Sequence, residues 1–231
     1  MIKTEEDFKN GQVLLIDKPL NWTSFQAVNK MRWHIKQRFN IKKIKVGHAG
    51  TLDPLATGLL IICTGKQTKE IDTYQGQIKE YTGTFTLGAT TPSYDLETEI
   101  DETFSIEHIS ESLLNETINQ FIGDIQQKPP IFSAIKKEGK RLYELARKGE
   151  TTEIKARTVT ISEFEITNIN LPNVDFRVVC SKGTYIRSLA FDYGKALKSG
   201  AHLSVLRRTK IGNFSVENAV SIDAFIKSLE I

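Results

Sequence analysis

The sequence is poor in cysteine and lacks long apolar runs, and both absences exclude classes of protein. Two cysteines among 231 residues are too few for the disulfide framework of a small secreted domain. The longest apolar run, Leu59 to Cys63, is far shorter than the roughly 20 residues that span a bilayer. The first ten residues contain acids and no apolar signal-peptide core. We therefore expect a chain without a leader or membrane segment, located in the cytoplasm.

Basic residues are missing from one long stretch, and this unevenness predicts a polyanion partner. There is no Lys or Arg between Glu80 and Lys128, a gap that holds nine acids. The net charge of the whole chain is +3, but outside this gap the chain has 31 bases and 19 acids, a charge of +12. Such segregation favours a cationic face for a polyanion and an acidic face turned away, although random clustering on a solvated surface gives the same count.

Internal repeats and Pro- or Ser-rich linkers are also absent, so we expect a single domain over residues 1–231. Apolar runs and alternation predict strands at 11–19, 59–65, 81–87, 158–168, 174–180 and 203–211, the fourth and fifth as an antiparallel pair. Periodicity predicts helices at 24–39, 109–121 and 184–197, and a short helical piece at 143–147. In the first helix we expect Phe25, Val28, Met31, Ile35 and Phe39 to share one face. Strand pairs mixed with helices indicate the α+β class.

The stretch GHAGTLDPLATGLL, which begins at Gly47, is the most informative motif. Gly47 and Gly50 flank His48 and permit unusual backbone angles. Asp53 precedes a proline, which favours an extended conformation at the end of a turn. Because the loop lies between two predicted buried strands, it is suited to present the Asp53 carboxylate for catalysis. The alternative is that Asp53 only closes an Asx turn.

A second constellation, CSKGTYIRSLAFDYG, begins at Cys180. Gly183 ends a strand, Thr184 is expected to cap the next helix, and Tyr185 and Arg187 lie in its first turn. An arginine here is able to pair with a buried carboxylate and keep it ionised. The alternative is a surface arginine beside a core tyrosine.

Metal-binding and reactive-thiol patterns are absent. His48, His108 and His202 have no metal-ligand spacing, so no metal is expected. Cys63 and Cys180 both lie on apolar strands and are expected to be inert core thiols.

Six ordered blocks resemble one family, the TruB-type bacterial tRNA pseudouridine synthases, which isomerise uridine 55 in the T-loop. The resemblance runs from about Gly11 to Phe214. The blocks are DKPLNWTS, VGHAGTLDPLATGLL, KEYTGTFTLGATTPSYD, QKPPIFSAIKKEGKRLYELARKG, CSKGTYIRSLAFDYG and AHLSVLRRTKIGNF. Together they imply a pseudouridine-synthase fold, with a mixed, mostly antiparallel central sheet flanked by helices.

The resemblance also implies roles for individual residues. Asp53 matches the catalytic aspartate, His48 the histidine that lies against the flipped nucleotides, and Tyr81 the tyrosine that stacks on the target base. Tyr185, Arg187 and Leu206 match residues of the base pocket, with Arg187 expected to pair with Asp53. The basic insertion at about 127–157 matches an RNA-clasping element. The RNA-binding residues are expected to be Lys18, Lys136, Lys137, Lys140 and Arg141.

The resemblance implies a tRNA partner, recognised through its T-arm stem-loop, and a monomer without an obligate protein partner. Many family members continue into a small RNA-binding (PUA) domain. Only 17 residues follow the last block here, so no separate C-terminal RNA-binding domain is expected. A redox-neutral isomerisation needs a nucleophile and a way to reach the base, and no cofactor is expected.

Two other functions fit parts of the pattern. A non-catalytic RNA-binding or tRNA-folding module needs the basic segments but not Asp53. A metal-dependent nucleic-acid hydrolase using His48 and Asp53 needs a second carboxylate cluster, which this loop lacks. Within the synthase reading, the sequence leaves open whether Asp53 attacks C1′, attacks C6 or acts first as a base.

Overall fold

The computed structural model describes residues 4–133, 135–137, 140–142, 144 and 154–229. The chain divides into two compact units, the first comprising residues 1–81 and 206–231 and the second residues 82–205. Two strands, β4 (Lys79–Leu87) and β12 (Ala201–Ile211), have residues in both units. Single-domain behaviour of the whole chain therefore stays a prediction.

The first unit is built on the long strand β3 (Ala56–Thr64). It pairs antiparallel with β1 (Val13–Lys18) and β2 (Val46–His48), and parallel with the C-terminal half of β12. Further pairs add β14 (Val220–Ser221) parallel to β1 and β13 (Phe214–Ser215) antiparallel to β12. The mixed directions place the turn after β2 next to the start of β3.

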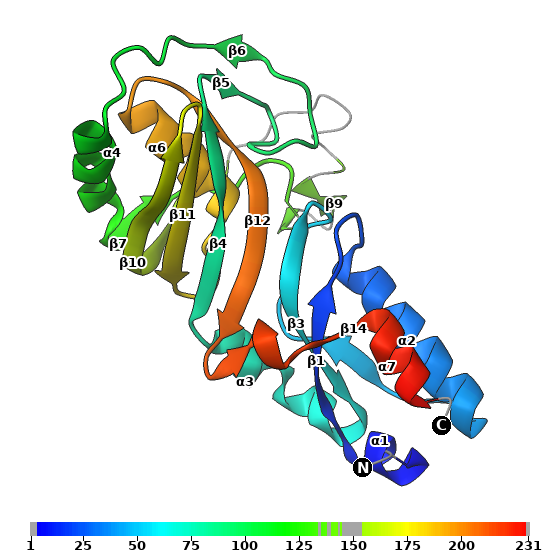
Figure 1. Ribbon diagram of the computed structural model, residues 1–231. Helices are drawn as coiled ribbons and strands as arrows, with labels where there is room; N and C mark the ends of the chain where they lie inside the picture. The colour runs from blue at the N-terminus through cyan, green and yellow to red at the C-terminus, as the bar shows by residue number, and fades with distance from the viewer. Residues whose placement is uncertain (1–3, 134, 138–139, 143, 145–153, 230–231) are drawn as a thin grey trace. The chain divides into compact units, whose positions relative to one another are not determined.

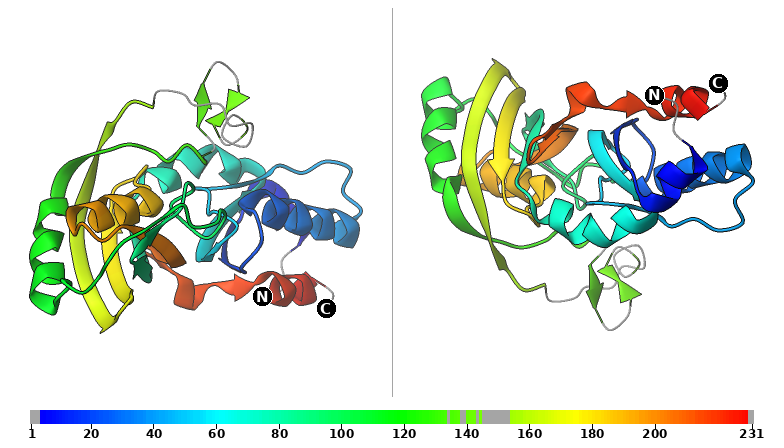
Figure 2. Two further views of the ribbon diagram at one scale, coloured as in Figure 1. Left: turned by 90° about the horizontal axis from the view of Figure 1, so that it is seen from above. Right: turned by 90° about the horizontal axis from the view of Figure 1, so that it is seen from below.

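Strand β3 is buried on both faces, which explains its continuous apolar run. Leu60 and Ile62 face a core that includes Phe8 of α1 (Glu5–Asn10), the buried side of α2 (Ser24–Phe39) and α7 (Ile222–Leu229). Leu59, Ile61 and Cys63 face a second cluster that includes side chains of α3 (Ile71–Gly76). Helices α2 and α7 lie side by side over the first of these faces (Figures 1 and 2). A strand sandwiched in this way gives the adjoining loop a firm base.

The second unit contains a sheet in the order β12, β4, β11, β10, β7. Strands β10 (Arg157–Asn170) and β11 (Asn173–Cys180) are an antiparallel hairpin, and β7 (Gly123–Gln127) pairs antiparallel with the start of β10. Helices α4 (Glu111–Ile118) and α6 (Ile186–Ala196) belong to this unit. Beside them lie the short 3-10 helix Asn119–Phe121 and a two-residue pair of β5 (Ala89–Thr90) and β6 (Glu102–Thr103).

Aromatic packing holds α6 onto this sheet. Phe85 of β4 stacks on Phe176 of β11 with ring centroids 4.0 Å apart. Tyr193 of α6 is fully buried and lies 5.6 Å from Phe164 and 5.8 Å from Phe85. Its hydroxyl donates to the carbonyl oxygen of Leu114 at 2.8 Å, which ties α6 to α4. The start of α6, which carries Arg187, is therefore positioned by the core of the unit.

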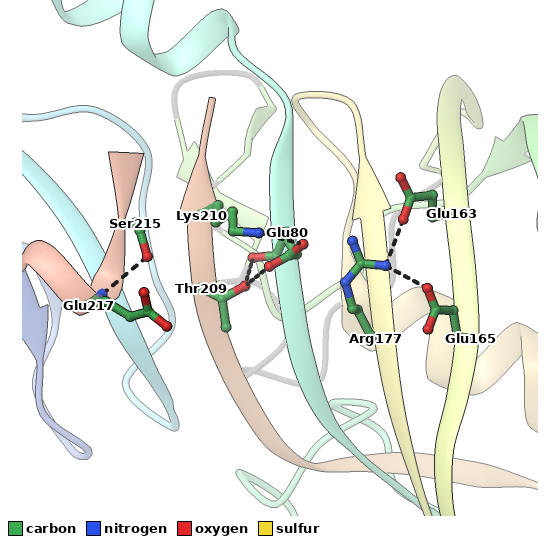
Figure 3. A network of polar contacts seen from close by, with 8 residues as sticks. All are labelled: Glu80, Glu163, Glu165, Arg177, Thr209, Lys210, Ser215 and Glu217. Atoms are coloured by element: carbon green, nitrogen blue, oxygen red, sulfur yellow. Dashed lines mark hydrogen bonds and ion pairs between the residues drawn. The ribbon is translucent and has the colours of Figure 1, made fainter. Parts of the chain in front are cut away.

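Charged side chains also link neighbouring strands (Figure 3). In the second unit, Arg177 of β11 donates to Glu163 and Glu165 of β10, both at 2.6 Å. In the first unit, the Glu80 carboxylate accepts from the Thr209 hydroxyl at 2.7 Å and lies 3.3 Å from the Lys210 ammonium. The two contacts of Glu80 join β4 to β12 within the first unit.

Most predicted elements are confirmed, and the differences have local causes. Phe25 is 66% exposed, so it does not share the buried face of α2, which Ala27, Val28, Met31 and Ile35 form instead. The N-cap of that helix is Thr23, in a capping box with Gln26. The predicted helical piece at 143–147 falls outside the described residues except for residue 144. Nearby, β8 (Lys136–Lys137) and β9 (Lys140–Arg141) pair antiparallel.

The prediction that Thr184 caps α6 is wrong. The N-cap is Tyr185, and its backbone N–H donates to the side-chain oxygen of Gln127 at 2.8 Å. The Gln127 amide donates in return to the Tyr185 carbonyl oxygen at 3.1 Å. Gln127 is fully buried and comes from β7, so a residue distant in sequence supplies the cap. Thr184 instead donates from its hydroxyl to the Ser181 carbonyl oxygen.

Gly58 allows β3 and β12 to approach closely enough to shape the adjoining loop. Its φ is +102°, and a Cβ atom there would lie 2.3 Å from the Arg208 carbonyl oxygen. We expect Gly58→Ala to lower the free energy of unfolding by about 2 kcal/mol or more, because it combines backbone strain with a backbone clash. Gly76→Ala is the control, since nothing lies within 4 Å of its added Cβ. Denaturant unfolding of both variants tests this, and equal stabilities would contradict it.

Candidate active site

The loop that carries Asp53 is held by hydrogen bonds to its backbone. The buried Ser24 hydroxyl accepts from the Leu52 N–H at 2.9 Å and lies 3.1 Å from the Leu52 carbonyl oxygen, to which it can donate. The Asn21 N–H donates to the Pro54 carbonyl oxygen at 2.8 Å, and the Ala56 N–H donates to the Asp53 carbonyl oxygen at 3.1 Å. The residues on both sides of Asp53 are thus tied to the start of α2. The side chain of Asp53 itself is half-buried.

Arg208 of β12 is a second anchor of the same loop. It is 1% exposed and is among the largest side chains that are fully buried. Its Nε donates to the Leu59 carbonyl oxygen at 2.8 Å, and its two terminal nitrogens donate to Gly50 at 3.1 Å and Thr51 at 3.4 Å. One planar guanidinium therefore connects β12, β3 and the turn that precedes Asp53.

Lys18 lies at the end of β1 in the same unit and is fully buried. Its ammonium donates to the carbonyl oxygens of Pro19 at 2.8 Å and Trp22 at 2.7 Å. Burial lowers the pKa of Lys18 to about 8, and the Arg208 charge adds to the lowering while the carboxylates of Asp53 and Asp17 oppose it. The role predicted for Lys18 in RNA binding stays a prediction.

A bidentate ion pair lies next to Lys18. Arg207 donates to the two carboxylate oxygens of Asp17 at 2.7 and 3.1 Å. Because Arg207 and Arg208 are adjacent on a strand, one points toward this partly exposed pair and the other into the protein. The loop is thus bordered by three cations, Lys18, Arg207 and Arg208.

His48 lies at the end of β2 and is half-buried. Burial lowers its pKa, the Arg208 charge lowers it further, and a backbone hydrogen bond to Gly50 partly opposes both. The ring is therefore neutral at pH 7, which suits packing against nucleobases better than pairing with phosphate.

Tyr81 and Leu206 also belong to the first unit, and they are the residues at which its two segments of chain end and resume. Tyr81 is 8% exposed and Leu206 is 9% exposed. Leu206 pairs in register with Ala56, three residues after Asp53, and its carbonyl oxygen accepts from the Thr57 hydroxyl at 3.5 Å. The structure thus places Leu206 beside the end of the loop.

Tyr185 and Arg187 belong to the second unit. Arg187 is 4% exposed; it forms an ion pair with Asp95 at 3.5 Å and donates to the Ser93 carbonyl oxygen at 3.3 Å. Asp95 was not among the predicted site residues. The predicted pairing of Arg187 with Asp53 stays a prediction.

Tyr185 lies under a cation. The Arg157 guanidinium is 4.9 Å from the centre of its ring, and Arg157 also donates to the Gly183 carbonyl oxygen. The Tyr185 backbone is the cap held by Gln127, as described above. The contact with Arg157 orients the Tyr185 ring at the start of α6.

The predicted RNA-binding residues of the insertion lie on β8 and β9. Lys136 is opposite Arg141, and Lys137 is opposite Lys140. The side chains of these four residues lie outside the described part of the structure. The backbone register nevertheless places four bases on one short hairpin.

Sequence reasoning missed Arg208, Ser24, Asp95 and Gln127. A signal existed for Arg208, because alternation along β12 places it on the same side as Leu206, where a charge is unexpected. Ser24 was considered only as a helix cap. Asp95 and Gln127 carry no local signal, because their partners are more than 50 residues away.

Comparisons with known proteins show the family of the chain. The family model described as TruB family pseudouridylate synthase, N-terminal domain, matches residues 36–186. The model described as tRNA pseudouridylate synthase B C-terminal domain matches residues 187–230. The chain belongs to the TruB family of pseudouridine synthases. The protein is accordingly an isomerase, as the sequence predicted.

Two curated relatives of this TruB-family enzyme are named tRNA pseudouridine synthase B. The one from Flavobacterium johnsoniae is 68% identical over 228 residues, which cover 98% of this chain and all of the relative. The one from Phocaeicola vulgatus is 58% identical over 224 residues, covering 97% of this chain and 95% of the relative.

Solved structures confirm the fold of this TruB-family enzyme. A Cbf5–Nop10–Gar1 complex contains a chain that matches with a TM-score of 0.71 and 28% identity, covering 98% of this chain and 61% of that one. An H/ACA RNP bound to a substrate RNA containing 2′-deoxyuridine matches with a TM-score of 0.68 and 28% identity, covering 95% and 53%. The expected α+β pseudouridine-synthase fold is confirmed, and most strand pairs described above are antiparallel. No helix in the described ranges is long and apolar enough to cross a membrane.

The charge of Arg208 is predicted to affect the pKa of two neighbouring groups in the TruB-family site. Arg208→Met should raise the pKa of both His48 and Lys18, because a positive charge that opposes their protonation is removed. It should also lower the free energy of unfolding by about 2–4 kcal/mol, because buried carbonyl oxygens lose their donors.

Arg208→Lys is the matched control, since it keeps the charge and loses the planar fork. We expect the pKa of His48 in this variant to stay low. Titration of the His48 ring by NMR distinguishes the two variants. An unchanged pKa in Arg208→Met would show that the guanidinium does not govern the electrostatics of the loop.

Proposed function

We propose that this enzyme converts uridine 55, in the T-loop of tRNA, to pseudouridine, with Asp53 as the nucleophile and the target base flipped out of its stack. The single observation that carries the proposal is the anchored Asp53 loop, in which Ser24 and Arg208 hold the backbone before a half-buried carboxylate and Arg208 also holds Leu59 after it. The curated relatives named tRNA pseudouridine synthase B support tRNA as the substrate.

The reaction is a rearrangement without net redox change. The bond between C1′ and N1 breaks, a bond between C1′ and C5 forms, the proton on C5 leaves, and N1 is protonated. A carboxylate nucleophile makes this possible by splitting the exchange of bonds into two steps. Held by backbone hydrogen bonds, Asp53 loses little freedom when it meets the sugar, which lowers the entropic part of the barrier.

Cationic side chains lie around the Asp53 loop. Lys18 lies close enough to Asp53 for the carboxylate to affect the pKa of the ammonium. We propose that Arg187, held by Asp95 and Ser93 in the second unit, is the additional partner of Asp53 in the working enzyme. Its orientation by Asp95 leaves the guanidinium little rotational freedom.

Flipping the base costs a few kcal/mol, which must be returned by contacts in the site. We propose that Tyr81 stacks on the flipped base, that the neutral His48 ring lies against neighbouring nucleotides, and that Leu206 and Tyr185 line the base pocket. Stacking of a base on an aromatic ring is worth about 1–3 kcal/mol. The contact with Arg157 fixes the orientation of the Tyr185 ring in this role.

We propose that the affinity for tRNA comes from the basic insertion at 127–157. From Lys128 to Arg157 it holds nine bases and four acids, a charge of +5. The facing strands β8 and β9 bring Lys136, Lys137, Lys140 and Arg141 together on a hairpin suited to clasp an RNA backbone.

Asp53→Asn tests the proposal, because an amide has the size of a carboxylate but is neither nucleophilic nor basic. We expect single-turnover formation of pseudouridine in a tRNA transcript to be abolished, with tRNA affinity close to that of the wild type. Asp223→Asn, at an exposed carboxylate of α7, is the control and should keep full activity.

Near wild-type turnover by Asp53→Asn would remove Asp53 from the mechanism. Failure of the wild-type enzyme to form pseudouridine at position 55, with tRNA still bound, would instead favour the RNA-binding module or another target uridine.

Tyr81 is tested by a pair of substitutions. Tyr81→Phe keeps the ring and should bind tRNA as the wild type does, whereas Tyr81→Leu should lose about 1–3 kcal/mol of binding free energy. Because Tyr81 is buried, the unfolding free energy of each variant is measured alongside its affinity. Equal affinity of a folded Tyr81→Leu protein and the wild type would contradict stacking. A slow but tightly binding Phe variant would assign a role to the hydroxyl.

A further inference from the structure

We propose that an exposed basic surface formed by α2 and the segment directly after it is a second RNA-binding surface, separate from the catalytic loop and from the basic insertion. This α2 basic surface consists of Lys30, Trp33, Lys42, Lys43 and Lys45. This proposal rests on the proposed function only in assuming that the bound RNA is tRNA.

The surface has a single sign of charge. No acidic residue occurs between Asp17 and Asp53 in the sequence. Within the described residues, no ion pair involves any of the four lysines of the α2 basic surface. Their charges are therefore available to neutralise phosphate groups and release the counterions bound to them.

Packing of α2 determines which side chains remain outside. The helix buries Val28, Met31 and Ile35 in the core of the first unit. Lys30 and Trp33 are three residues apart, so they are neighbours on the opposite, exposed side. Trp33 is 55% exposed and is oriented by an edge contact with His34, whose ring centre is 4.6 Å away.

The segment directly after α2 contributes three further exposed lysines. Ile41 is buried in the same core, and Ile44 packs against it. These two anchors leave Lys42, Lys43 and Lys45 exposed beside them. The three lysines are thus carried on a backbone attached to the core at two points.

An RNA fits this surface better than a protein or a membrane. Lysines without interspersed acids suit a polyanion, and a single exposed tryptophan provides a platform for one unstacked base. A membrane-binding helix would need a broad apolar face, but the apolar side of α2 is already buried against α7 and β1.

Lys30 and Trp33 lie too far along the helix to take part in the chemistry. Ser24, which bonds Leu52 next to Asp53, begins the helix. At 1.5 Å per residue, Lys30 lies about 9 Å and Trp33 about 14 Å along the axis from Ser24. Changes here should therefore alter affinity and leave the rate on bound tRNA unchanged.

The test uses the full-length protein and an unmodified tRNA transcript. Lys42→Gln with Lys43→Gln should weaken binding and make the slope of log K against log salt shallower by about 1.4–1.8, as expected for two lost phosphate contacts. Trp33→Leu should weaken binding by about 5- to 150-fold without changing that slope, and Trp33→Tyr should restore most of it. Lys195→Gln with Lys198→Gln removes the same charge from exposed positions of the second unit and should leave the slope unchanged.

An unchanged salt slope in the folded Lys42/Lys43 variant, or a change of equal size in the control, would overturn the proposal. So would an affinity of Trp33→Leu equal to that of the wild type. The single-turnover rate at saturating tRNA should match the wild type in every variant, and a rate defect there would place these residues in the catalytic site instead. Failure of the wild type to form pseudouridine would defeat the proposed function, but the salt slopes would still report on this surface.

Discussion

The geometry of the candidate site depends on a buried guanidinium that replaces water as the hydrogen-bond donor to three backbone carbonyl oxygens. Arg208 reaches Leu59 at the end of the loop and Gly50 and Thr51 at its beginning, so the two ends of the Asp53 segment are bonded to one side chain. Ser24 adds a second attachment from the opposite side. Without these bonds the loop would retain unsatisfied carbonyls and many conformations, both of which oppose a fixed nucleophile.

The same charge affects the neighbouring groups. Burial lowers the pKa of both His48 and Lys18, and the Arg208 charge adds to both effects, while the ion pair of Arg207 with Asp17 covers the adjacent edge. A site arranged in this way presents a carboxylate among cations beside a neutral ring. This combination is what the proposed reaction needs, in which Asp53 acts on a uridine whose base is held by stacking. Under the same proposal, phosphate groups are bound elsewhere, by the insertion and the α2 basic surface.

The predictability of each feature follows the range of the interactions that form it. Strands β1, β3, β10 and β11 and helix α2 could be predicted, because local apolar patterns and the Thr23 cap determine them. The exposure of Phe25 could not, because it depends on which side of α2 meets the core. The Asp53 loop could be recognised from its motif, but its anchor Arg208 is 155 positions away and becomes visible only when β12 pairs with β3. The cap of α6 was mispredicted for the same reason, since Gln127 arrives from a distant strand.

Amide hydrogen exchange in the RNA-free enzyme tests most directly whether the Asp53 loop is fixed before substrate binds. The amides of Leu52, Ala56 and Asn21 donate to Ser24, Asp53 and Pro54 respectively, so each should be strongly protected from exchange. Protection approaching that of the β3 core amides would support a loop that is fixed in advance. Exchange of these three amides at the rate of an unstructured chain would contradict the account and indicate that the loop is ordered only by the RNA.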